Sequence, residues 1–133
     1  MSKRKSRSIN IPGLDHGSAP IPMGARVGNM IFSSGIMGRH AETGEIPDDA
    51  EGQAKLVFSN LRAFLEQAGA SLEDVGHVTA FIRDDSVRKA LNDQWLVYFP
   101  DPDDRPARHT LVHSLPGPLK IQLEIIAVVG EGM

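Results

Sequence analysis

AKLVFSNLRAFLEQAG, residues 54–69, is the stretch that predicts the fold most directly. Its apolar residues recur at spacings of three and four, so they form one stripe along a helix that packs onto a core. The stripe contains Ala54, Val57, Phe58, Leu61, Phe64, Leu65 and Ala68. Asp48 or Asp49 can cap the start of this helix, and Gly69 provides a left-handed residue at its end.

The chain after this helix alternates between strand and helix patterns. Ser71 to Asp74 has capping-box spacing and predicts one short turn, and HVTAFIR at 77–83 is rich in β-formers and predicts a strand. A second helix follows, capped by Asp85 or Ser86, and its inward apolar residues are Val87, Leu91, Trp95 and Tyr98 or Phe99. A proline-rich loop at 100–106 leads to two further strands, at 108–113 and 119–129, joined by a turn at 115–118.

Upstream of the first helix, residues 25–27 and 30–32 flank Gly28-Asn29 and predict a β-hairpin. Residues 40–49 predict a polar loop. The element order is therefore ββ-α-β-α-ββ. Because strand–helix–strand connections are right-handed, both helices are expected on the same face of one mixed sheet. The fold class is α+β, a two-layer sandwich.

The second face of this sheet is also apolar in part. The final strand places Ile126 and Val128 opposite its inward residues, and Phe81 lies on the same second face of the 77–83 strand. Two helices cannot cover both sides of a sheet. We therefore predict that the second face is buried against other copies of the chain. The alternative is that these are scattered apolar residues on the surface.

Composition excludes several classes of protein. The chain has 133 residues, which indicates one domain, predicted at 20–133 after a flexible basic lead-in at 1–19. A formal net charge of −3 makes a general nucleic-acid binder unlikely, although Lys3, Arg4, Lys5 and Arg7 can be read as a phosphate-binding arm or as a solvated terminus. The sequence contains no cysteine, which fits the cytoplasm. No apolar run is long enough to span a membrane, and no apolar stretch follows the basic start, so a secretory signal is not expected.

Arg108, in the run RPAR at 105–108, is the leading candidate for a binding residue. It stands where a strand begins, behind a proline that fixes the approach of the chain. A guanidinium held there presents a rigid fork that matches a carboxylate with two hydrogen bonds. The alternative is a surface arginine paired with a nearby acid, and Asp101, Asp103 and Asp104 are available.

Two further groups are candidates for the same site. Ser34 and Gly35 end a strand, where small residues let backbone amides approach a ligand. Gln122 and Glu124 share one face of the final strand, beside the Arg108 strand if the 115–118 turn forms a hairpin. A carboxylate near an arginine either relays a proton or forms an ion pair. His109 and His113 are too far apart on a strand to chelate a metal easily, so no metal site is predicted.

These pieces together resemble the RidA/YjgF family. The matching segments are VGNMIFSSG at 27–35, Asn60-Leu61 followed by GASLEDV at 69–75, Asn92, RPAR at 105–108 and KIQLEIIA at 120–127. The resemblance covers roughly residues 20–129. It implies a chorismate-mutase-like fold, a homotrimer with clefts between subunits, and hydrolytic deamination of reactive enamines and imines with no cofactor.

The resemblance also implies roles for single residues. Arg108 matches the arginine that holds the substrate carboxylate, Ser34 and Gly35 line the pocket, Asn92 lies near it, and the backbone of Thr110 helps to place a water. Two positions depart from the family pattern. Ile21 stands where active deaminases usually carry a tyrosine, and Gln122 stands where a carboxylate is expected. An amide orients water but relays no proton at neutral pH, so Glu124, on the same face, is the substitute we expect.

Three functions remain open at this point. The first is deamination of small 2-imino acids to 2-oxo acids and ammonia, with Arg108 and Glu124 as the catalytic residues. The second is non-catalytic or regulatory binding of 2-oxo acids and similar carboxylates on the same trimer, which Gln122 favours. The third is a catabolic deaminase of the aminomuconate type. Its substrate carries two acid groups, so it needs a second basic residue, and Arg26, Arg39 and Arg105 are the candidates.

Overall fold

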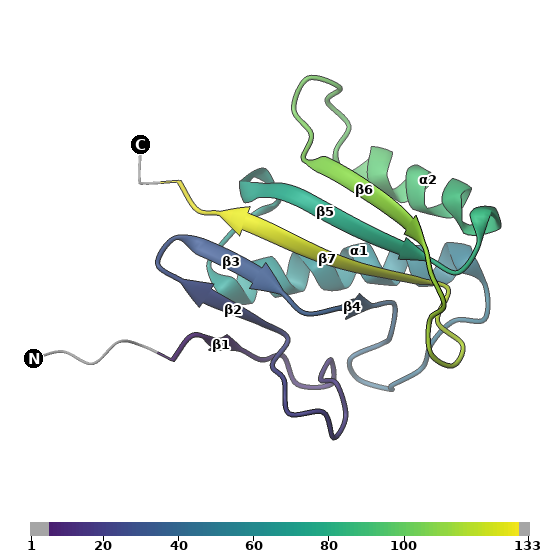
Figure 1. The fold of residues 1–133 in the computed structure, drawn as a ribbon, viewed down its shortest axis with the longest axis horizontal. Coiled ribbons are helices and arrows are strands. Elements are labelled where there is room, and N and C mark those ends of the chain that lie inside the picture. The colour runs from purple at the N-terminus through teal and green to yellow at the C-terminus, as the bar shows by residue number, and fades with distance from the viewer. Residues whose placement is uncertain (1–5, 131–133) are drawn as a thin grey trace, which may run out of the picture.

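The computed structural model describes residues 6–130, which form seven strands and two α-helices (Figure 1). The strands are β1 (Ser8–Ile9), β2 (Gly24–Val27), β3 (Met30–Ser33), β4 (Ile36–Met37), β5 (Val75–Ile82), β6 (Ala107–Val112) and β7 (Ile121–Val128). The helices are α1 (Ala50–Ala68) and α2 (Arg88–Tyr98), and the 3-10 turns η1 (Leu72–Asp74) and η2 (Asp85–Val87) precede β5 and α2.

All seven strands belong to one sheet with the order β1-β2-β3-β7-β5-β6, and β4 also pairs with β7. The β5–β6 pair is parallel and the other pairs are antiparallel. Figure 1 shows both helices on one side of this mixed sheet. The predicted two-layer α+β sandwich is confirmed.

Helix α1 is the centre of the core and confirms the predicted apolar stripe. Every residue of that stripe is buried, and so is the alternate set on β7 that begins at Ile121. The side-chain carboxylate of Asp49 accepts a hydrogen bond from the Gly52 amide, and Gly69 ends the helix at φ 81°. Of the two predicted caps, Asp49 is therefore the one used.

Two buried polar side chains of α1 fix the loops that surround the core. The Gln53 amide donates to the carbonyls of Pro47 (2.8 Å) and Pro118 (2.9 Å) and accepts from the Lys120 amide. Asn60 donates to the carbonyls of Met37 (2.8 Å) and Arg39 (2.9 Å). Because a buried amide without partners is costly, these bonds hold the loops beside β4 and before β7 in one position.

The predicted cap of the second helix is wrong. Neither Asp85 nor Ser86 caps α2, because both lie inside η2. The carboxylate of Asp84 instead accepts from the Ser86 amide at 2.9 Å and caps η2. A tight 3-10 turn between strand and helix moves the cap one residue upstream.

The last two strands do not form the hairpin that the sequence left open. β5 lies between β6 and β7, so the turn at 115–118 carries the chain across β5 rather than to a neighbouring strand. The β5–α2–β6 connection places β6 at the edge of the sheet. β7 then fills the gap between β3 and β5 and pairs antiparallel with both.

The chain before residue 20 is more ordered than the predicted lead-in. Ser8–Ile9 forms β1 on the edge of β2, and Ile9 and Leu14 lie in the core. Lys3, Arg4 and Lys5, which the sequence allowed to be either a solvated terminus or a phosphate-binding arm, lie outside the described residues. In the part of the chain that the structure describes, neither helix is long and apolar enough to cross a membrane.

The face of the sheet opposite the helices, here called the open face, carries exposed apolar side chains. Met30 pairs across the strands with Val128, and Phe32 pairs with Ile126. These four side chains are 38–45% exposed. The predicted apolar second face is therefore present, and neither helix covers it.

Candidate functional site

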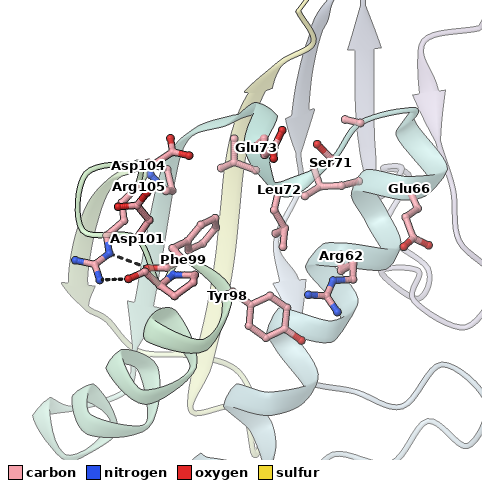
Figure 2. A pocket seen from close by; sticks show the side chains of 15 residues that line it. Arg62, Glu66, Ser71, Leu72, Glu73, Tyr98, Phe99, Asp101, Asp104 and Arg105 are labelled. Carbon is pink, nitrogen blue, oxygen red and sulfur yellow. Dashed lines mark hydrogen bonds between the residues drawn. The ribbon is translucent and has the colours of Figure 1, made fainter.

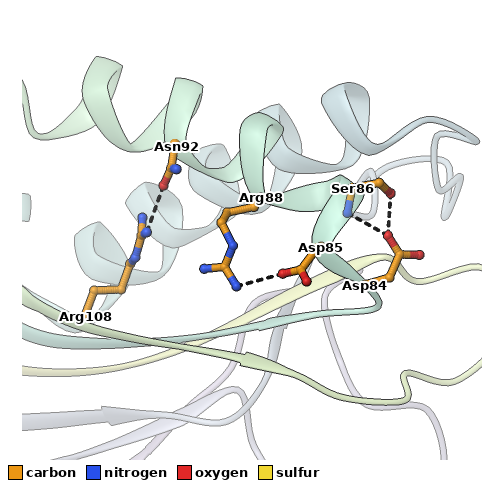
Figure 3. A network of polar contacts seen from close by, with 6 residues as sticks. All are labelled: Asp84, Asp85, Ser86, Arg88, Asn92 and Arg108. Carbon is orange, nitrogen blue, oxygen red and sulfur yellow. Dashed lines mark hydrogen bonds and ion pairs between the residues drawn. The ribbon is translucent and has the colours of Figure 1, made fainter.

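Arg108 extends from the edge strand β6 towards α2. It pairs in register with Val78, which is fully buried under the helices, so Arg108 is on the helix side of the sheet. Its Nη2 donates to the Asn92 side-chain oxygen at 2.8 Å, as Figure 3 shows. Its guanidinium lies 4.8 Å from the centroid of the Trp95 ring.

One face of α2 fixes the position of this guanidinium. Asn92 and Trp95 are three residues apart and therefore lie on the same side of the helix. Trp95 is itself held by Phe99, whose ring centroid lies 4.8 Å from its own. Trp95 is a core residue, as predicted, and its ring also supports the cation of Arg108.

The guanidinium of Arg108 has an unused hydrogen-bond donor. Its Nη1 is buried and has no hydrogen-bond partner within residues 6–130. Burial lowers the pKa of Arg108, and the nearby positive charge of Arg88 lowers it further, although an arginine stays charged at neutral pH. An unpaired buried donor costs about 1–3 kcal/mol. An anion that accepts a hydrogen bond from Nη1 would remove this cost.

The alternative of an ion pair between Arg108 and the acidic loop is excluded for this arrangement. No carboxylate in residues 6–130 forms a salt bridge with Arg108. Asp101 accepts instead from the Asp103 amide at 2.9 Å. The cation is held by neutral and aromatic partners and keeps its charge available.

A second group of candidate residues surrounds a bulge between β3 and β4. Phe32 pairs with Ile126 and Ile36 pairs with Leu123, so three residues on one strand oppose two on β7. The Ser33 hydroxyl accepts from the Ile125 amide at 2.8 Å and so holds the bulge against β7. The bulge contains Ser34 and Gly35, as the sequence predicted for a strand end.

Gly35 lies directly against Gln122. A Cβ at position 35 would collide with the side-chain amide nitrogen of Gln122, so a larger residue there would push the Gln122 side chain out of this position. Ser34 donates from its hydroxyl to the Pro22 carbonyl at 2.8 Å. Pro22 follows Ile21, whose side chain is half exposed. The bulge thus brings residue 21, residues 34–35 and Gln122 into one neighbourhood.

Glu124 lies beside this group on the open face. It pairs with Thr79, and together with Ser33 and His77 these side chains line a small hollow of about 200 Å³. Glu124 is exposed and makes no salt bridge among the described residues. Its carboxylate is therefore available for a partner or for proton transfer.

The two groups lie on opposite faces of the sheet within one chain. Arg108 and Thr110 face the helix side of β6, whereas Gln122 and Glu124 face the open side of β7. The Arg108 strand does not run beside Gln122 and Glu124, as a hairpin at 115–118 would require, because β5 separates them. Sequence alternation gave the correct face within each strand but not the strand order.

A wider hollow, about 700 Å³, is a different feature (Figure 2). It lies between the end of α1 and the 98–106 loop, and Arg62, Tyr98 and Arg105 line it, whereas Arg108 does not. Arg105 donates to the Phe99 carbonyl at 2.8 Å and thereby fixes the loop that leads into β6. Its role here is structural.

The three predicted second basic residues are all bound to backbone carbonyls. Arg26 donates to Ala68 (2.7 Å), Arg39 to Asp15 (2.6 Å) and Arg105 to Phe99. The basic residue whose charge acts on Arg108 is Arg88, which the sequence reasoning missed. Its spacing of four residues from Asn92 was the signal that could have identified it.

Within residues 6–130, no cluster of three or more His, Asp or Glu side chains could hold a metal ion. The acidic groups near Arg108 and Gly35 are too few to form a ligand set of their own. The chemistry available at these positions is therefore that of a guanidinium, two amides and one free carboxylate.

Known proteins share this sequence pattern over most of the chain. The sequence model of the family described as Endoribonuclease L-PSP matches residues 19–129. A 2-iminobutanoate/2-iminopropanoate deaminase of Escherichia coli K12 is 32% identical over 125 residues, which cover 92% of this chain and 98% of the relative.

Solved structures agree as well. The YjgF gene product of Escherichia coli superimposes with a TM-score of 0.83 at 31% identity, covering 92% of this chain and 98% of the other. Escherichia coli TdcF with bound serine gives a TM-score of 0.84 at 30% identity, with the same coverage. The fold, the matched residues and these relatives together show that the chain belongs to the RidA/YjgF family, the family described as Endoribonuclease L-PSP.

Proposed function

We propose that this chain is an enzyme that hydrolyses small 2-imino and 2-enamino acids to 2-oxo acids and ammonia. The observation that carries the proposal is Arg108, a cation held on Trp95 and Asn92 with no acidic partner among the described residues and one donor unused. Such a group fits a carboxylate bonded to the reacting carbon. The relative named 2-iminobutanoate/2-iminopropanoate deaminase supports the reaction class. The serine bound to TdcF supports a small ligand that carries a carboxylate.

The second part of the proposal is a homotrimer in which each site lies between two protomers. One chain carries Arg108 on the helix side and the Gly35–Gln122 group on the open face, so a single copy cannot bring them together. Packing the open face of one protomer against the β6 edge of the next would do so. The exposed apolar side chains of β3 and β7 favour burial in such an interface.

The reaction needs little from the protein beyond positioning. A protonated imine is electrophilic at carbon, so water adds there, a C–O bond forms and the C=N electron pair moves to nitrogen. The resulting tetrahedral species loses ammonia and leaves the 2-oxo acid, whereas an enamine must first take a proton on carbon. Holding substrate and water in register therefore supplies much of the acceleration.

Each residue has a proposed task in this reaction. Arg108 anchors the carboxylate, Asn92 orients Arg108, and the backbone of Thr110 and the Gly35 bulge shape the space for water. Gln122 orients the water through its amide, and Glu124 takes the proton that the water loses. Ile21 adds an apolar wall at the entrance. We propose the cytoplasm as the compartment, which a chain without cysteine fits.

The second candidate function is binding of 2-oxo acids without turnover. It is favoured by the amide of Gln122, which lies against Gly35 where a carboxylate would be the stronger base. Tight binding of 2-oxo acids with no loss of imine would establish this function in place of the first.

The test of the deaminase uses an amino acid oxidase to generate imines and semicarbazide to trap those that survive. Wild type should lower the rate of semicarbazone formation, and Arg108→Ala should reduce kcat/KM by about 100-fold or more, the loss expected for two charge-assisted hydrogen bonds. The matched control is Arg62→Ala, since Arg62 also lies over an aromatic ring, 4.7 Å from the centroid of Tyr98, but in the large hollow. Equal imine decay in wild type and Arg108→Ala would end the deaminase proposal.

The assembly is tested separately. Wild type should sediment as a trimer at micromolar concentration, and Ile126→Asp should dissociate it, whereas Val97→Asp, also an exposed apolar position, should not. Mixing Arg108→Ala with Gly35→Trp should restore about a quarter of the activity, because a random mixture forms that fraction of intact shared sites. A stable wild-type monomer would contradict the shared site.

A further inference from the structure

Arg88 is the feature of the Arg108 neighbourhood that the proposed function does not use. It is the first residue of α2, and Asn92 and Trp95 follow it at spacings of four and seven. Residues at these spacings share one helix face. Since Asn92 and Trp95 both contact Arg108, this face of α2 is the one turned to the β6 arginine.

The position of Arg88 carries two unfavourable electrostatic interactions. A cation at a helix N-terminus opposes the helix dipole. The charge of Arg88 also acts on Arg108, whose pKa it lowers in addition to the effect of burial. Figure 3 shows both guanidinium groups between α2 and the sheet. An anion bound between them would offset the repulsion between the two positive charges.

The counter-ion of Arg88 is weakly held. Its Nη2 lies 3.0 Å from an Asp85 carboxylate oxygen, as Figure 3 shows, but the two side chains are 43% and 81% exposed. An exposed pair of this kind exchanges readily with water or with another anion. Asp85 thus positions the Arg88 guanidinium through an ion pair that another carboxylate can displace.

We infer that Arg88 is a specificity-determining residue that binds a second carboxylate, so that the preferred substrates are 2-imino acids with two acid groups. This inference rests on the proposed function, since it assigns the first carboxylate to Arg108. The second carboxylate of the ligand takes the place of Asp85 beside Arg88, and Arg88 donates charge-assisted hydrogen bonds to that carboxylate. The same chemistry distinguishes 2-oxo dicarboxylates from 2-oxo monocarboxylates on the product side.

The chain offers a matched control for this residue. Lys89, the next residue on α2, has the same charge and a similar exposed ion pair, with Asp93 at 2.8 Å. It lies about 100° around the helix from Arg88, since an α-helix has about 3.6 residues per turn. Lys89→Gln therefore removes the same charge from the same helix without touching the face that meets Arg108.

The experiment measures the dissociation constants of 2-oxobutanoate and 2-oxoglutarate. Trp95 is the only tryptophan in the sequence and carries the Arg108 guanidinium, so its fluorescence reports binding, with calorimetry as a second readout. Wild type should bind the dicarboxylate about tenfold more tightly, the effect of roughly 1.4 kcal/mol. Arg88→Gln should reduce that ratio to about one and leave the monocarboxylate unchanged, and Arg88→Lys should keep part of the preference.

The outcomes separate this inference from the function on which it rests. An unchanged ratio in Arg88→Gln, or an equal loss in Lys89→Gln, overturns the role of Arg88. Arg108→Ala should lose both ligands. If Arg108→Ala instead binds both ligands like wild type, the proposed site itself is wrong, whatever Arg88 does. Because the Arg88 side chain is only partly buried and lies outside the hydrophobic core cluster, its variants should keep the wild-type circular dichroism spectrum and remain measurable.

Discussion

The two faces of strand β7 differ sharply in exposure to solvent. Ile121, Leu123 and Ile125 are at most 2% exposed beneath the helices, whereas Ile126 and Val128, from the same strand, are 40% and 45% exposed. The face beneath the helices, here called the closed face, is covered within one chain, where Gln53 and Asn60 of α1 bind backbone carbonyls. The open face carries the bulge, Gln122 and Glu124, and neither helix covers it. Stability and function are therefore assigned to alternate residues of one strand.

The largest expected effect lies on the closed face. Leu123→Ala removes a fully buried side chain and should lower the free energy of unfolding by about 3 kcal/mol. Glu124→Ala, its neighbour on the open face, should change it by less than about 0.5 kcal/mol. Urea denaturation with circular dichroism measures both. Equal losses would mean that the two faces are not distinct in energy.

The next effect sharpens the role of the open face. Gly35→Ala should lower deaminase kcat/KM by about tenfold, because the new methyl group displaces the Gln122 amide, while the melting temperature changes little. Gln122→Ala gives room for that methyl group. In the double variant the Gly35→Ala substitution should therefore cost less than it does alone. Additive losses would show that the contact between residues 35 and 122 has no role.

The smallest expected effect concerns helix α1, which covers the closed face. Asp49→Ala removes the carboxylate that caps α1 and should cost about 1 kcal/mol of unfolding free energy. Asp48→Ala is the matched control, since Asp48 is exposed and does not cap the helix. A loss of the same size in both variants would indicate a general charge effect rather than a cap.

The sequence predicted some parts of this molecule well for a clear physical reason. The α1 stripe, the Gly28-Asn29 hairpin and the two faces of β7 follow from local periodicity and turn chemistry, and the structure confirms them. The position of Arg108 behind the RPAR loop is equally local. The prediction of the α2 cap was wrong because η2, a 3-10 turn of three residues, is too short to show a distinctive periodicity in the sequence.

The candidate site depended more on tertiary structure. Trp95 was correctly predicted as core, but its contact with Arg108 was invisible in the sequence. Arg88 was passed over in favour of Arg26, Arg39 and Arg105, each of which the fold binds to a carbonyl. An arginine is available to a ligand only if no backbone carbonyl lies within reach of its guanidinium. The positions of those carbonyls are set by the folded loops and cannot be read from the spacing of residues.

By itself the sequence determined which side chains share a face, where the helices end and which arginine stands at a strand entrance. These features depend on residues within a few positions of one another. Only the tertiary structure decided that β5 separates β6 from β7 and that Arg108 and Gln122 therefore occupy opposite faces. Strand order is set by packing between segments far apart in the chain, where the burial of β7 between β3 and β5 outweighs the short turn that precedes it.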